Sequence, residues 1–245
     1  MLNIAPRVVV YPHGSPPPPV EEGWLALAQF DSWPPATLDS PPAGSGPALA
    51  VGRQHAVFGD GSHPTTRLCA GAVDLLCRQR PGLTVLDVGT GTGILARIAA
   101  ARGATYVVGT DIDPAAVACA QAHAELDCSA SPGRRVPEPD AGAAAAGVRT
   151  TGASGANIHF GSEASDHWGA RFDLVVANIL EAPLHALAPA LCRALKPGGV
   201  LLISGFTRPQ APALRLAYET AGLQAAGDFT LDDWVLLKFT QSFSR

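Results

Sequence analysis

The chain has 245 residues and a formal net charge of −4; 47% of its residues are hydrophobic and 16% are charged, as expected for a globular protein with an ample core. Its Lys and Arg residues form no cluster larger than Arg134-Arg135, and no apolar run approaches the roughly 18 residues of a membrane span, so we expect neither a nucleic-acid substrate nor a membrane protein. The five cysteines form no C-x-x-C pair and the N-terminus lacks signal-peptide features, which together predict reduced thiols and a cytoplasmic location.

Residues 1–50 are rich in proline and hold 11 of the 22 prolines of the chain. Because proline disrupts both helices and central strands, we expect this segment to be mostly loop and turn, around one hairpin that includes the β-rich residues 7–11. The apolar side chains between Trp24 and Trp33 predict either a lid packed on the main domain or the aromatic walls of a substrate pocket. We expect the main domain to occupy residues 51–245.

A loop of glycines and small polar residues precedes the first expected helix. Residues 56–66 read Ala-Val-Phe-Gly-Asp-Gly-Ser-His-Pro-Thr-Thr, and Pro64 is well placed to begin a helix that runs to about residue 77. Such a loop could fold against a ligand. The alternative is ordinary capping of the helix by Ser62 or Thr65.

A glycine-rich turn between two β-rich runs is the most informative part of the chain. The first run leads into Gly89, Gly91 and Gly93, a helical pattern follows, and the second run ends at Asp111 and Ile112. This order is typical of a nucleotide-binding β-loop-helix-β unit, in which glycines let the backbone approach a ligand and the helix N-terminus favours electron-rich groups. Asp111, about 22 residues beyond Gly89, is suitably spaced to accept hydrogen bonds from ribose hydroxyls.

Two classes of cofactor fit such a unit. The dinucleotide fingerprint of an NAD-binding oxidoreductase needs a third glycine three positions after the second, where this chain has Ile94. The G-x-G-x-G pattern, with Asp87 in the strand just before it, resembles instead the first motif of class I S-adenosylmethionine (SAM)-dependent methyltransferases. SAM has no pyrophosphate to seat, so the loop can turn more sharply. A turn that needs glycine only for its backbone angles would not explain Asp111.

The remaining elements complete an α/β fold. We expect a Rossmann-like class I methyltransferase sheet with helices on both faces and a closing antiparallel strand pair. Residues 129–156 interrupt it; 13 of these 28 residues are Gly or Ala, so we expect a mobile insertion outside the core. The expected helices are 114–126 (capped by Asp113), 182–195 and 209–221; the expected strands are 157–160, 172–177, 200–204 after a turn at 197–199, and a pair within 225–239.

Several stretches together resemble the PrmA-type methyltransferases, from about residue 48 to the C-terminus. They read FGDGSHPTT, VLDVGTGTGILA, VVGTDIDPAAV, DLVVANILEAPLHALAP, LKPGGVLLISG and DDWVLLKF, in this order. Members of that family trimethylate amines on the eleventh protein of the large ribosomal subunit. The resemblance implies that Thr66, Gly89, Asp111 and Asn178 contact SAM. It also implies that S-adenosylhomocysteine is the product.

The family normally begins with a small α/β domain that grips the ribosomal protein. Residues 6–12 resemble the strand that follows that domain, so we expect only the catalytic domain here. The acceptor therefore stays open among an amine of a small molecule, a peptide or a protein lysine. A SAM-binding module without catalysis is a further alternative, which the intact stretch after Asn178 disfavours.

Ligands of open α/β sheets lie outside the carboxyl ends of the strands, so the strand-end residues should share one crevice. These residues are Gly89, Asp111, Ser162, Asn178 and Gly205. We expect Ser162, with Glu163 and Asp166, near the adenine end. We expect the methyl group to face the acceptor at the stretch that begins with Asn178.

Methyl transfer needs mainly alignment of the reacting groups and exclusion of water. A lysine-like amine has a reference pKa of about 10.4, so the site must favour its neutral form. Asn178 could accept the N–H bonds of that amine, or could merely cap the next helix. His63 and Glu181 are candidate proton acceptors; their structural alternatives are bracing of the loop and a solvated helix start. No His, Cys and carboxylate grouping has metal-ligand spacing, so we expect no metal.

Overall fold

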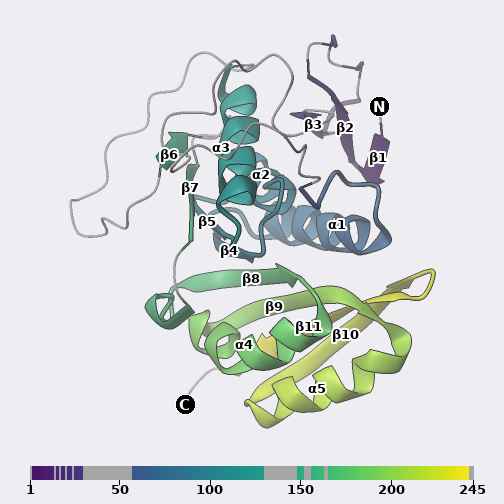
Figure 1. The fold of residues 1–245 in the computed structure, drawn as a ribbon, viewed down its shortest axis with the longest axis vertical. Coiled ribbons are helices and arrows are strands. Elements are labelled where there is room, and N and C mark those ends of the chain that lie inside the picture. The colour runs from purple at the N-terminus through teal and green to yellow at the C-terminus, as the bar shows by residue number, and fades with distance from the viewer. Residues whose placement is uncertain are drawn as a thin grey trace.

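The structure is a computed structural model that describes residues 2–29, 57–129, 148–151 and 156–242, except for residues 14, 17, 20, 24, 163 and 164. Its main sheet has eight strands in the order β10-β11-β9-β8-β4-β5-β7-β6 (Figure 1). The five neighbouring strands β9, β8, β4, β5 and β7 are parallel, and the pairs β6–β7, β9–β11 and β10–β11 are antiparallel. The strands are β4 (Thr84–Val88), β5 (Tyr106–Thr110), β6 (Val148–Thr151), β7 (Asn157–Gly161), β8 (Phe172–Asn178), β9 (Leu195–Thr207), β10 (Leu223–Leu231) and β11 (Trp234–Gln241).

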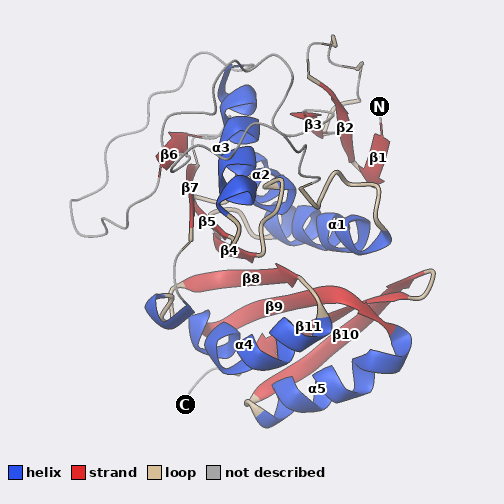
Figure 2. Ribbon diagram, viewed as in Figure 1, coloured by secondary structure: helices blue, strands red, loops and turns tan. Residues whose placement is uncertain are grey.

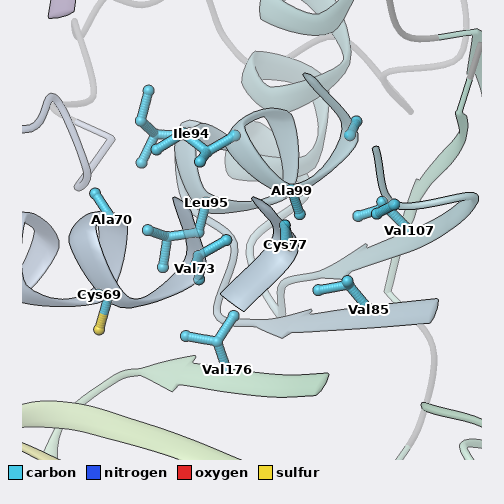
Figure 3. Packing of buried hydrophobic residues seen from close by; sticks show 14 of the residues in the cluster. Cys69, Ala70, Val73, Cys77, Val85, Ile94, Leu95, Ala99, Val107 and Val176 are labelled. Atoms are coloured by element: carbon cyan, nitrogen blue, oxygen red, sulfur yellow. The ribbon is translucent and has the colours of Figure 1, made fainter. Parts of the chain in front are cut away.

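Helices cover both faces of this sheet, as predicted, because successive strand residues point to opposite faces. Val85 and Val176 face a first core cluster with α1 (Pro64–Gln79) and α2 (Ile94–Ala101), which Figure 3 shows from close by. Leu86 and Val175 face a second cluster on the other side. That second cluster includes α4 (Glu181–Ala194) and α5 (Ala211–Thr220), and α3 (Pro114–Ser129) contacts β6 and β7 at the far edge (Figure 2).

The helix boundaries and the closing strand pair agree with the sequence to within a few residues. Two elements differ. The turn expected at residues 197–199 lies inside β9, where the pairing register to β8 shifts between Phe172 and Leu174. Within the insertion, residues 148–151 form β6 and pair with β7, because a strand at the open edge of a sheet needs only backbone hydrogen bonds. Residues 130–147 and 152–155 lie outside the described part of the chain.

The N-terminal segment contains the expected hairpin, β1–β2, and a third strand that was not expected extends it into a second sheet. Strands β1 (Leu2–Ala5) and β2 (Val8–Pro12) are antiparallel, and β3 (Leu25–Gln29) is parallel to β2. Most of the prolines fall between or beyond these strands, so they do not disturb the ladder. Buried side chains of this sheet join the first core cluster, among them Ile4, Val8 and Leu27. Trp24 and Trp33 lie outside the described residues.

Two arginines fasten this N-terminal sheet to the main domain. Arg97 of α2 has a fully buried side chain, donates two hydrogen bonds of 2.8 and 2.9 Å to the carboxylate of Asp127, and a third of 2.6 Å to the carbonyl of Ala28 in β3. Arg102, just after α2, donates to Asp74 at 2.6 Å and to the carbonyl of Arg7 at 3.0 Å. The N-terminal sheet is therefore packed against the main domain through charged hydrogen bonds as well as apolar contacts.

Replacement of Arg97 tests this attachment. We expect Arg97→Ala to lower the free energy of unfolding by about 3–5 kcal/mol, because it leaves the largely buried carboxylate of Asp127 without its partner. Arg215→Ala is the control: its ion pair with Asp228 is more exposed, so its loss should cost less than about 1 kcal/mol. Urea denaturation measures both values, and equal losses would contradict the proposed anchoring role.

Candidate active site

A pocket of about 890 Å³ lies where the carboxyl ends of the parallel strands meet the loop before α1. Its lining includes every strand-end residue that the sequence singled out: Gly89, Asp111, Ser162, Asn178 and Gly205. Gly91, Ile112 and His63 also line it. Three other predicted site residues, Thr66, Gly93 and Glu181, are not among the lining residues.

The first side of the pocket is the glycine turn between β4 and α2, which is tied to the end of β5. The carboxylate of Asp111 accepts hydrogen bonds from the amides of Gly91 and Asp113, each at 3.0 Å. The amide of Gly89 donates to the carbonyl of Thr110 at 2.8 Å. Each carboxylate oxygen of Asp111 has a further lone pair, so Asp111 can brace the turn and still accept a ligand hydroxyl.

The three glycines of this turn all have left-handed backbones, with φ of 71°, 53° and 78°. Each also touches a different part of the protein, at a distance that a side chain would not allow. A Cβ on Gly89 would overlap Ile179, and one on Gly91 would overlap the carbonyl of Phe58. A Cβ on Gly93 would lie 2.9 Å from that of Ala120. From the sequence, we predicted that the glycines let the backbone approach a ligand. The structure shows that they also let other parts of the protein approach the turn.

Beneath the turn lies the buried carboxyl group of Asp87. One of its oxygens accepts hydrogen bonds from Thr90 Oγ1 at 2.7 Å and from the amide of Ala96 at 3.2 Å; the other has no partner among the described residues. Burial raises the pKa of Asp87 from 3.8 to about 7, and the nearby charge of Asp111 adds to this effect. Asp87 therefore holds the turn while being close to its point of protonation at neutral pH.

An aromatic wall formed by Phe58, His63 and Trp234 also lines the pocket. The ring centroids are 5.3 Å apart for Phe58 and His63 and 4.6 Å apart for His63 and Trp234, both in edge arrangements. His63 caps α1: its Nδ1 accepts from the amide of Thr65 at 3.3 Å. A neutral imidazole with Nδ1 as acceptor carries its proton on Nε2, so this ring has no second acceptor nitrogen to offer.

Asn178 ends β8 and presents an amide at the edge of the pocket. Its Nδ2 donates to Thr66 Oγ1 at 3.4 Å. Its Oδ1 is buried and has no hydrogen-bond partner among the described residues. Buried acceptors are normally satisfied, so an orphaned oxygen in a pocket lining is a natural position for a ligand donor. Thr66, which the resemblance placed at the cofactor, lies behind Asn178 and bonds to it.

Glu181 begins α4 outside the pocket lining. Its carboxylate accepts a hydrogen bond of 2.5 Å from Gln210 Nε2 and lies 3.7 Å from His185 Nε2. The contact with Gln210 holds the start of α4 against the short 3-10 helix Arg208–Gln210 that follows β9. Phe58 and Ile179 line the pocket within two stretches that were expected to face a ligand, the loop 56–66 and the stretch after Asn178. Trp168 and Trp234 line it without having been predicted, because an apolar side chain gives no sign of the pocket that it will face.

Within the described part of the chain, no three His, Cys, Asp or Glu side chains could together hold a metal ion. None of the described helices is long and apolar enough to cross a membrane.

The strand order and the pocket at the strand ends define a class I SAM-dependent methyltransferase fold, as predicted. The family described as ribosomal protein L11 methyltransferase (PrmA) matches residues 55–242, so this chain belongs to the PrmA family. This match confirms the resemblance found in the sequence motifs.

Comparison with known proteins adds close relatives and a common architecture. Ribosomal protein L11 methyltransferases of Hydrogenovibrio crunogenus and Dechloromonas aromatica are 36% and 39% identical over 186 and 181 residues, which cover 75% and 74% of this chain. They cover 52% and 50% of those relatives, so the chain spans about half the length of the curated relatives that it matches. A crystal structure of a ribosomal protein L11 methylase from Lactobacillus delbrueckii subsp. bulgaricus has the same fold, with a TM-score of 0.68 and 24% identity over 98% of both chains.

The buried carboxyl group of Asp87 predicts a specific pH dependence of stability. Between 3.8 and about 7 the folded protein retains a proton that the unfolded chain has lost, so this stabilisation is present at low pH and is lost as the pH rises through about 7. We expect Asp87→Asn, which is neutral throughout, to be more stable than the wild type at about pH 8 by on the order of 2–4 kcal/mol, and similar to it near pH 4. Urea denaturation across this range measures both; parallel pH profiles would contradict the assignment.

Proposed function

We propose that this chain is a SAM-dependent N-methyltransferase that methylates an amine of a protein, with ribosomal protein L11 as the first candidate acceptor. The observation that carries the proposal is the orphaned, buried Oδ1 of Asn178, a residue of an otherwise largely apolar pocket lining that also contains the glycine turn and Asp111. The names of the relatives favour a protein over a small-molecule acceptor. A peptide or small-molecule amine remains the alternative that the same geometry could serve.

The residues of the first side suit the cofactor. Asp111 would accept the ribose hydroxyls, and Ile112, which is 98% exposed beside it, would be covered by the adenine ring. Ser162 also lines the pocket and follows Gly161, whose carbonyl accepts a hydrogen bond from the amide of Asp111 at 3.2 Å. When bound, SAM supplies a methyl group activated by a positively charged sulfur. An NAD-binding reading is disfavoured because Ile94, at the third glycine position, is a buried core residue.

Two predicted cofactor residues would act through their neighbours. Thr66 holds the amide of Asn178, and Gly93 allows the start of α2 to pack against Ala120 of α3. Gly89 and Gly91 line the pocket directly. We therefore assign Thr66 and Gly93 to support of the site rather than to direct contact with SAM.

The part of the pocket around Asn178, its second side, suits an amine. Asn178 Oδ1 would accept an N–H of the amine and so direct its lone pair toward the methyl group. Titratable side chains in the described lining are His63, Asp111 and Asp113. Asp111 is engaged by the turn, His63 uses Nδ1 to cap α1, and Asp113 accepts a hydrogen bond from the amide of Ala115 at 2.9 Å, so we assign none of the three as the proton acceptor. Transfer to an apolar pocket lowers the pKa of an ammonium group, so the amine would lose its proton to water on docking.

Cofactor binding tests the role of Asp111. We expect Asp111→Ala to weaken S-adenosylhomocysteine binding by about 1–3 kcal/mol, because the variant loses the ribose acceptor and the brace of the turn. Glu219→Ala, at an exposed position on α5, should leave the affinity unchanged. Isothermal calorimetry measures these affinities, with NAD as a second ligand. Binding of NAD rather than S-adenosylhomocysteine by the wild type would favour the oxidoreductase alternative.

Turnover of ribosomal protein L11 with labelled SAM tests the reaction itself. We expect label on L11, and we expect Asn178→Ala to reduce SAM affinity by about 0.5–1.5 kcal/mol while single-turnover rates fall by on the order of 100-fold, because alignment matters most in the transition state. Glu181→Gln should retain near wild-type rates if this carboxylate is no base. Label on small molecules alone would contradict the protein acceptor, and no label on any amine would contradict the reaction.

A further inference from the structure

Ile179 lies at the junction between the two sides of the pocket. Strand β8 ends at Asn178 and α4 begins at Glu181, so only Ile179 and Leu180 connect them. Leu180 is 73% exposed, whereas Ile179 is partly buried against the second core cluster and also lines the pocket. Ile179, the neighbour of Asn178, is therefore part of both the core packing and the pocket lining.

The backbone of Ile179 is held by the end of β9. Its amide donates to the carbonyl of Ser204 at 3.2 Å. Gly205 has φ of 100°, and a Cβ there would overlap the carbonyl of Ile179 and lie 3.0 Å from its nitrogen. The hydroxyl of Ser204 is itself bonded to the carbonyl of Val235 in β11 at 2.7 Å. This side of the connection has little room to move.

The side chain of Ile179 reaches the glycine turn. Its Cγ2 methyl occupies the space that a Cβ on Gly89 would need. Gly89 is hydrogen-bonded to Thr110, the residue before Asp111, so this methyl group rests on the part of the turn that is tied to the proposed ribose acceptor. The apolar contact between Ile179 and Gly89 therefore joins the connection after Asn178 to the glycine turn on the proposed cofactor side.

We propose that Ile179 is a positioning residue for methyl transfer: its Cγ2 methyl, packed on Gly89, sets the separation between Asn178 and the glycine turn. This inference rests on the proposed function. A β-branched side chain has a strongly restricted χ1, so the methyl group is a stiff spacer. A displacement of about 1 Å can cost on the order of 100-fold in rate, so a spacer here affects turnover far more than it affects cofactor affinity.

The shape of the side chain, rather than its size, should decide activity. Valine retains both γ-carbons of isoleucine, whereas leucine has the same composition as isoleucine but no branch at Cβ. With L11 as acceptor, we expect Ile179→Val to keep kcat within about threefold of the wild type, and Ile179→Leu to lower kcat by about 10- to 100-fold with little change in KM for SAM. Thermal melting checks that each variant is folded. Wild-type kcat in a folded Ile179→Leu variant would overturn the proposal.

A double-mutant cycle with Gly89 tests the contact without any acceptor. We expect Gly89→Ala to weaken S-adenosylhomocysteine binding at least tenfold more in the wild type than in Ile179→Ala, because the smaller side chain makes room for the new methyl group. The strain of alanine in a left-handed backbone is present in both backgrounds and cancels. Additive losses would overturn the inference. If the wild type fails to methylate L11, the proposed function fails, and this cycle still decides whether Ile179 and Gly89 are coupled.

Discussion

The turn between β4 and α2 depends on the close packing of three glycines against other parts of the chain. Gly89, Gly91 and Gly93 have left-handed conformations, and each is in contact with a segment that comes from elsewhere in the chain. The ideal positions of their missing side chains are taken by Ile179, the carbonyl of Phe58 and Ala120. The turn therefore serves as a common contact for the α4 connection, the loop before α1 and helix α3. A larger residue in the turn would displace the protein as well as any ligand.

This packing links the proposed cofactor side to the proposed acceptor side. The amide of Thr92 donates to the carbonyl of Phe58 at 3.1 Å and its hydroxyl to that of Gly59 at 2.6 Å, so the aromatic wall begins on a loop fastened to the turn. His63 caps α1 at the end of the same loop. The carboxyl group of Asp87 supports the turn by hydrogen bonds. Burial of this group disfavours its charged form, and its pKa is raised for that reason.

Local patterns were sufficient for most of the fold. Apolar runs in β4, β5 and β8 and the glycine spacing after β4 are properties of neighbouring residues, so they predicted the parallel sheet and its turn. The general rule that ligands lie at the carboxyl ends of parallel strands then brought Asp111 and Asn178 into one predicted crevice. The hairpin of the N-terminal sheet was predicted but its third strand, β3, was not, because proline composition describes the whole segment and not the short runs between prolines. Arg97 gave no sign that it would be buried, since its partners lie in α3 and β3.

The sequence by itself determined the class of protein, the glycine turn and the residues at the strand ends, because each depends on spacing along the chain. Only the tertiary structure decided which segments press against the turn and which side chains line the pocket. Ile179 is 90 positions from Gly89, and Trp234, which contacts His63, belongs to β11, the last strand along the chain. Contacts over such separations follow from how strands and helices pack, which local residue patterns do not record. The exposed Ile112 and the orphaned oxygen of Asn178 likewise became visible only when burial was known.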